Sequence, residues 1–183
     1  MITSMLTFTS LGPSSLRLTS DGSPMTIFPD PVPTKINEKD GVLLLSVPEE
    51  KTSSMAVISW PGEYNQGGIS VHGIGHDDGK QVSYVVDADR TRIAFLSSPV
   101  KDWTEKQVES VGDIDVLVLP AADVKLTQKL VDEFDPRVLI LLPGKDKDAL
   151  KSVEKVIGVK ERVSEYKIKG ALPVEGREVV VLV

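Results

Sequence analysis

The sequence predicts an α/β protein in which layered β-sheets are packed between helices. The first half of the chain alternates short apolar runs with turns rich in Gly and Pro, which is typical of strands. The second half alternates continuous apolar runs with segments whose apolar residues recur every three to four positions, which is typical of buried strands and amphipathic helices. Strands that give way to strands mixed with helices favour layered sheets with helices outside them.

Short strands separated by turns are expected in the first half. Gly-Pro and Asp-Gly sequences mark turns at 12–15 and 21–24. The three prolines in 29–33 remove backbone donors, so this segment is expected to be a loop. The expected strands are 6–9, 16–19, 25–28, 42–45, 55–60 and 68–71.

Strands and helices alternate in the second half. Asp89-Arg90 is expected to turn a hairpin between strands at 82–86 and 92–96. Thr104 and Gln107 have the spacing of a capping box, which predicts a helix that begins at Thr104. Later strands are expected at 116–120, 138–143, 162–169 and 178–183, and helices at 126–134 and 147–157, the latter with Leu150, Val153, Val156 and Ile157 inward.

Composition limits the possible classes of function. A chain of 183 residues with 40% hydrophobic content is expected to form one domain, 1–183. The absence of Cys excludes disulfides and thiolate metal sites. A formal net charge of -6 argues against nucleic-acid binding. With no apolar run long enough for a membrane span and no secretion signal at the start, the protein is expected to be cytoplasmic.

One stretch is more specific than the rest. It begins with Trp-Pro-Gly-Glu-Tyr at 60–64 and continues through a glycine-rich segment to His76-Asp77. The segments 95–98, 105–107, 113–120 and 136–140 follow in an order and spacing that resemble small hydrolases of the metallo-β-lactamase fold, the branch that includes sugar-lactone hydrolases. The Asp-Pro pair at Asp30 resembles a turn of the same family.

The resemblance implies a specific architecture and chemistry. The fold would be an αββα sandwich, with two mixed β-sheets flanked by helices, here reduced in size. Family members carry metal ions, zinc or manganese, in a cleft at the strand ends. Such ions lower the pKa of a bound water and polarise the bond to be cleaved.

Most of the family's metal ligands are absent from the aligned positions. The resemblance places the family motif His-x-His-x-Asp-His at 46–52, where its aspartate position holds Lys51. A lysine ammonium repels a metal cation. Of the remaining family ligands only His76 is kept. The substituted positions hold Val47, Glu49, Thr52, Ser98 and Pro143.

The sequence therefore favours a catalytically degenerate, non-enzymatic protein that has lost the family zinc or manganese. Its partner would be an unknown small molecule or protein bound in the former cleft, with Lys51 available to an anion. No catalytic residue and no metal ligand is assigned. The expected ligand-binding residues are Asp30, Glu49, Lys51, His76, Asp77 and Ser98.

Two alternatives stay open. A hydrolase of phosphodiesters or lactones would need an altered metal site, made by His76, Glu49, Asp30 and Asp77. A homo-oligomeric assembly subunit would pair strand edges such as 179–183 across copies of the chain.

Four aromatic and histidine residues have simpler structural interpretations. His76 is expected to be a loop histidine bonded to Asp77 or Asp78, and His72 to lie on a strand in a surface or packing role. Trp60 and Trp103 are expected in the core. The Pro-Gly-Glu-Tyr segment is interpreted as a structural turn.

Overall fold

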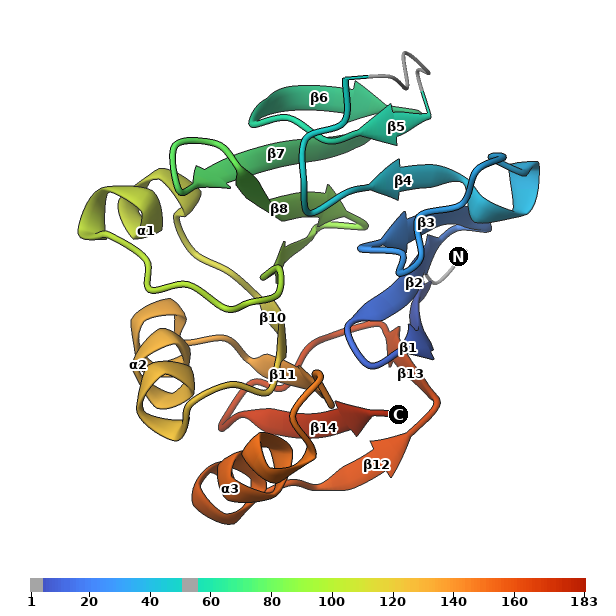
Figure 1. Ribbon diagram of the computed structural model, residues 1–183. Coiled ribbons are helices and arrows are strands. Elements are labelled where there is room, and N and C mark those ends of the chain that lie inside the picture. The colour runs from blue at the N-terminus through green and yellow to red at the C-terminus, as the bar shows by residue number, and fades with distance from the viewer. Residues whose placement is uncertain (1–4, 51–55) are drawn as a thin grey trace.

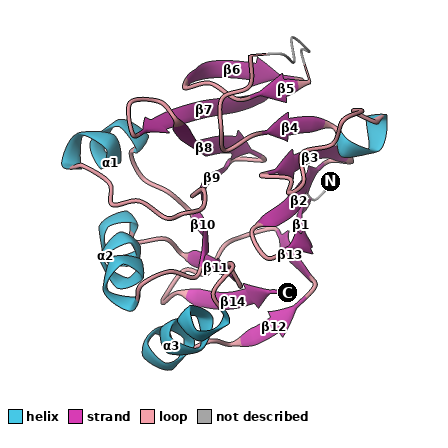
Figure 2. Cartoon of the chain, viewed as in Figure 1, coloured by secondary structure: helices cyan, strands magenta, loops and turns pink. Residues whose placement is uncertain are grey.

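The computed structural model describes residues 5–50 and 56–183, which form two β-sheets stacked face to face (Figures 1 and 2). Strands from both ends of the chain make the smaller sheet. In spatial order its strands are β13 (Glu165–Lys169), β1 (Met5–Gly12), β2 (Ser15–Ser20), β3 (Ser23–Ile27), β4 (Val42–Leu44) and β5 (Val57–Ile58).

The larger sheet takes most of its strands from the middle and end of the chain. In spatial order they are β12 (Glu161–Val163), β14 (Glu178–Leu182), β11 (Val138–Leu142), β10 (Val116–Pro120), β9 (Thr91–Phe95), β8 (Gln81–Ala88), β7 (Ile69–His76) and β6 (Gly62–Gln66). Neighbouring strands pair antiparallel from β6 through β7 and β8 to β9. They pair parallel from β9 through β10, β11 and β14 to β12. The smaller sheet is also mixed, because β3, β4 and β5 pair parallel and its other strands antiparallel. The predicted pair of mixed sheets is confirmed.

In the part of the chain that the structure describes, the three α-helices all pack on the outer face of the larger sheet. They are α1 (Glu105–Val111), α2 (Val124–Phe134) and α3 (Lys147–Ile157), which lie together on one side of Figure 1. The 3-10 turn η1 (Glu38–Asp40) lies beside the smaller sheet instead, where Thr26 Oγ1 donates to the backbone oxygen of Asp40. The capping box of Thr104 and Gln107 forms as predicted.

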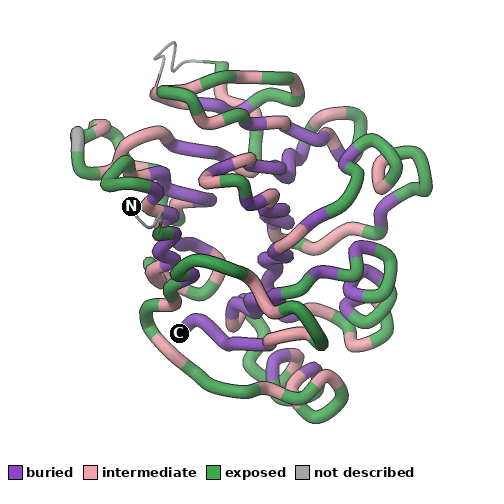
Figure 3. Tube along the Cα trace, turned by 180° about the vertical axis from the view of Figure 1, so that it is seen from behind, coloured by how far each residue is buried: buried purple, intermediate pink, exposed green. Residues whose placement is uncertain are grey.

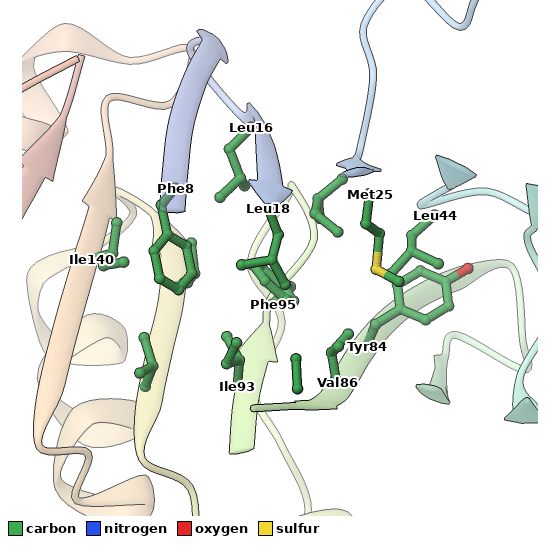
Figure 4. Close-up of a cluster of buried hydrophobic side chains, with 14 of the residues drawn as sticks. Phe8, Leu16, Leu18, Met25, Leu44, Tyr84, Val86, Ile93, Phe95 and Ile140 are labelled. Carbon is green, nitrogen blue, oxygen red and sulfur yellow. The ribbon is translucent and has the colours of Figure 1, made fainter. Parts of the chain in front are cut away.

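The core fills the space between the sheets. Side chains that alternate along β1 and β2 meet side chains of β8, β9 and β11, as Figure 4 shows for Phe8, Leu18, Phe95 and Ile140. The Tyr84 hydroxyl is polar but buried, and it donates to the backbone oxygens of Leu45 at 2.7 Å and Ile58 at 3.0 Å. This side chain therefore links β8 of the larger sheet to the β4–β5 edge of the smaller sheet.

Three predicted elements are wrong in detail. The expected strand 162–169 is two strands, because the chain leaves the larger sheet after Val163 and joins β1 of the smaller sheet from Glu165. Most of the expected Pro-Gly-Glu-Tyr turn is strand β6, whose backbone pairs with β7. Val156 is 53% exposed rather than inward, since the apolar face of α3 is narrower than its sequence indicates.

Two other predicted elements match their expected positions. The loop at 29–33 and the hairpin at Asp89-Arg90 are confirmed. The expected strand 55–60 is reduced to β5 among the described residues, and residue 55 lies outside them.

Across residues 5–50 and 56–183, no helix has both the length and the apolar character needed to span a membrane.

Candidate functional site

A cluster of polar side chains is buried where β7 ends, β8 begins and the loop after β9 leads toward α1. We call it the His76 network. Strand pairing brings these side chains together, because β7 and β9 run antiparallel to β8 and both end beside the start of β8. Its members are His76, Gln81, Ser83, Ser97 and Gln107.

Both ring nitrogens of His76 have partners inside the protein. Nε2 lies 3.0 Å from Ser83 Oγ, and Nδ1 lies 3.4 Å from Gln107 Nε2. An amide nitrogen only donates, so Nδ1 accepts and Nε2 carries the proton that is donated to Ser83. The same amide group of Gln107 donates to the backbone oxygen of Gly75 at 3.0 Å. The imidazole therefore has no free lone pair directed at a ligand.

The hydroxyl groups extend the network beneath the histidine. Ser83 Oγ accepts from the backbone N–H of Ser97 at 3.1 Å and lies 3.2 Å from Ser97 Oγ. The side-chain amide of Gln81 donates to Ser97 Oγ and to the backbone oxygen of Pro99, both at 2.8 Å. Because each buried polar group has a partner, the network avoids the penalty of an unpaired buried group.

Burial keeps His76 neutral. His76 is only 6% exposed. Its ring packs edge-on against the ring of Trp103, and the two ring centroids are 5.0 Å apart. Desolvation lowers the pKa of His76 below its ordinary value of 6.5, Asp77 opposes this shift, and Lys101 adds to it. A buried imidazole with a lowered pKa remains uncharged at neutral pH.

The expectations for His76 and the tryptophans are partly corrected. His76 ends strand β7 and is not a loop residue, and its partners are Ser83 and Gln107 rather than Asp77 or Asp78. Trp103 is buried as expected, but Trp60 is 48% exposed. His72 lies half-buried on β7, in agreement with its predicted surface or packing role on a strand.

The other expected ligand-binding residues are held in separate contacts. The carboxylate of Asp77 is exposed and pairs with Lys101 at 2.8 Å, which lowers the pKa of Asp77. Asp30 is exposed and lies 3.7 Å from Lys145 Nζ. Ser98 is half-buried, and the network uses its neighbour Ser97 instead. Lys51 lies outside the described residues.

Glu49 faces two shallow pockets beside the sheet edges. Its backbone N–H donates to Ser59 Oγ at 3.0 Å. One pocket, of about 430 Å³, is also lined by Trp60 and Tyr64, and the other, of about 380 Å³, is also lined by Val32 and its neighbouring loop residues. Tyr64 is fixed there by a hydrogen bond from its hydroxyl to the Trp60 backbone oxygen at 2.9 Å.

The residues that the structure describes do not form a metal-binding group. Within residues 5–50 and 56–183, no three His, Cys, Asp or Glu side chains come together in a group that could hold one. The four ligands of the alternative metal site, Asp30, Glu49, His76 and Asp77, are all among the described residues and do not form such a group. A catalytic zinc ion needs about three protein ligands.

Comparisons with known proteins show what the chain is similar to. No protein-family model matches it, and no curated protein matches it significantly. Among solved structures it is similar to a protein from Thermotoga maritima classed among the zinc-dependent hydrolases of the metallo-β-lactamase superfamily, with a TM-score of 0.78 and 22% identity over 97% of this chain and 98% of that one.

Two further solved structures share the fold at lower identity. A protein from Parabacteroides distasonis classed as a metal-dependent hydrolase has a TM-score of 0.66 and 13% identity over 97% of this chain and 93% of its own. The metallo hydrolase Igni18 from Ignicoccus hospitalis has a TM-score of 0.58 and 13% identity over 82% of this chain and 91% of its own. At these identities the likeness establishes that the chain has the metallo-β-lactamase fold.

Proposed function

We propose that this metallo-β-lactamase-fold chain is a non-enzymatic domain that acts by binding a small molecule or a protein partner. One observation carries the proposal: the single family-like histidine, His76, uses both ring nitrogens within a buried network. A histidine binds a metal ion through a free nitrogen lone pair. To coordinate an ion, His76 would have to give up its contact with Gln107 and leave its burial site.

The surrounding carboxylates support the same proposal. Asp77 and Asp30 are each paired with a lysine, so neither presents an unscreened negative charge to a cation. The hydroxyl and amide groups of Ser83, Ser97 and Gln81 beside His76 are neutral and satisfy one another. Neutral, internally bonded groups stabilise the strand ends without the charge that a divalent metal requires.

Metal analysis of the purified protein tests the proposal. The protein is produced in unsupplemented medium, and its zinc, manganese and iron are measured by mass spectrometry before and after incubation with each metal. The expected result is far less than one ion per chain and no metal-dependent turnover of a chromogenic phosphodiester or a lactone. The variant His76→Gln is expected to show the same metal content. His72→Gln, on the same strand, is the matched control.

The second candidate is a metal-dependent hydrolase with an altered site. Its support is that the similar solved structures are classed as metal-dependent hydrolases. It expects stoichiometric metal that His76→Gln removes and His72→Gln retains, together with turnover that a chelator abolishes. That result would replace the non-enzymatic proposal.

A further inference from the structure

A groove of about 910 Å³ lies at the opposite end of the sandwich from the His76 network. The hairpin turn between β8 and β9 and the residues just before β10 and β11 form one side of it. The other side comes from β1, β13 and the connection between β13 and β14, whose exposed stretch lies on the face toward the viewer in Figure 3. Parallel strands begin at this end, whereas the His76 network sits where β9 ends.

Two arginines distinguish this groove, and we call it the arginine groove. Arg90 and Arg137 line it, and neither makes an ion pair or a side-chain hydrogen bond with the described residues. The chain has six arginines. The other four are paired with carboxylates, Arg17 with Asp40, Arg92 with Asp87, Arg162 with Glu154 and Arg177 with Asp135. The unpaired guanidinium groups are thus gathered at one place.

The turn that carries Arg90 has an unfavourable backbone for its residues. Asp89 and Arg90 have φ angles of 53° and 60°, the left-handed region that two-residue hairpin turns require and that Asn-Gly adopts best. A residue with a Cβ in this region costs roughly 1–2 kcal/mol. Asp89 Oδ2 is also buried without a hydrogen-bond partner. The hairpin turn therefore sets the backbone conformation from which Arg90 lines the groove.

The opposite wall of the arginine groove is apolar. Leu6 and Ile168 are cross-strand partners on β1 and β13, and both are buried. Leu172 packs against the same core, and Val174 is 89% exposed in the connection to β14. The groove therefore places a hydrocarbon surface beside two unpaired cations.

We propose that the arginine groove binds a small amphipathic anion, a carboxylate or a phosphate monoester joined to a hydrocarbon body. The planar guanidinium groups of Arg90 and Arg137 match the oxygens of either anion. Burial of the hydrocarbon against Leu172 and Val174, which keep exposed surface in the groove, adds apolar contact. The volume lies within the range of small-molecule sites, roughly 300–1,000 Å³.

Two carboxylates in the lining make the groove select an amphipathic anion over a bare inorganic anion. Asp115 Oδ2 already accepts from the backbone N–H of Arg92 at 2.9 Å, and Asp89 retains its free oxygen. Their charges weaken the attraction for a bare inorganic anion. Both the anionic group and the hydrocarbon are therefore required. The site shares no residue with the His76 network, so this proposal does not depend on whether the chain binds metal.

Calorimetric titration tests the proposal with four probes at low salt: octanoate, octyl phosphate, octanol and inorganic phosphate. Saturable binding of one octyl anion per chain is expected, and the stronger of the two anions identifies the head group. Octanol and inorganic phosphate are expected to show no saturable binding. Arg90→Gln and Arg137→Gln are each expected to weaken binding about tenfold or more, since each removes charge-assisted hydrogen bonds.

The control and a second variant keep the test decisive. Arg162→Gln removes an exposed arginine on β12 and is expected to bind as the parent does. Val174→Asp changes the exposed apolar wall without touching the strained turn, and is expected to weaken binding even if Arg90→Gln disturbs that turn. The proposal is wrong if neither octyl anion binds the parent, if the double arginine variant binds as the parent does, or if octanol binds equally well.

Discussion

Replacement of His76 by glutamine is expected to remove a specific component of the acid sensitivity of this protein. The buried imidazole has a pKa lowered by desolvation from its ordinary value of 6.5. Below pH 6.5 the unfolded chain takes up a proton on this residue that the folded chain resists. The free energy of unfolding therefore falls as the pH falls. The stability that neutral His76 contributes is fully present above its ordinary pKa and is lost as the pH falls below that value.

The magnitude follows from linkage between protonation and folding. One histidine that stays neutral in the folded state lowers the free energy of unfolding by up to about 1.4 kcal/mol between pH 7.5 and 5.5. Glutamine does not titrate, so the His76→Gln variant lacks this component. The variant is expected to be less stable than the parent at pH 7.5, because Ser83 and Gln107 lose their partner, but its stability should change less with pH.

Urea unfolding followed by tryptophan fluorescence measures this difference at pH 7.5, 6.5 and 5.5. Trp103 packs against the His76 ring and reports directly on this region. His72→Gln is the control for loss of a histidine from β7. Parallel pH dependence in the parent and His76→Gln would refute the claim that a neutral, buried His76 anchors the network.

Three further substitutions test the packing around the sheets by urea unfolding. Gly73→Ala should destabilise the fold by about 2 kcal/mol, because the added Cβ would lie 2.8 Å from the Trp60 backbone oxygen; an unchanged midpoint would contradict this contact. Thr127→Val should stabilise α2 by about 1 kcal/mol, since the buried Thr127 hydroxyl has no partner, whereas Thr127→Ser should destabilise it. Gln107→Ala should cost about 1–2 kcal/mol, because the capping box and the hydrogen bonds to His76 and Gly75 are lost together, and the exposed Gln128→Ala should change little.

Elements with local signals were predictable from the sequence. Thr104 and Gln107 are three residues apart, so the cap of α1 is encoded within one turn. The hairpin at Asp89-Arg90 is likewise local, because two apolar runs flank a polar pair. The split at Ser164 had no such signal, since the side-chain pattern is similar on both sides while the backbone changes sheets.

The candidate sites depended on contacts that sequence spacing does not reveal. The partners of His76 are 7 and 31 residues away, and only the pairing of β7 with β8 and the placement of α1 bring them together. Serine at position 83, inside the otherwise apolar run 82–86, is a signal that could have indicated a buried polar partner. The arginine groove joins residues from five separate segments, so no motif marks it.

The last strands have a consequence for how the polypeptide is made. β14 lies between β11 and β12 inside the larger sheet, and β13 pairs with β1 of the smaller sheet. A ribosome that has synthesised only the first 160 residues has produced neither layer in complete form. The nascent chain therefore completes neither sheet until β12 to β14 emerge, and a product stalled before them exposes surfaces that promote aggregation.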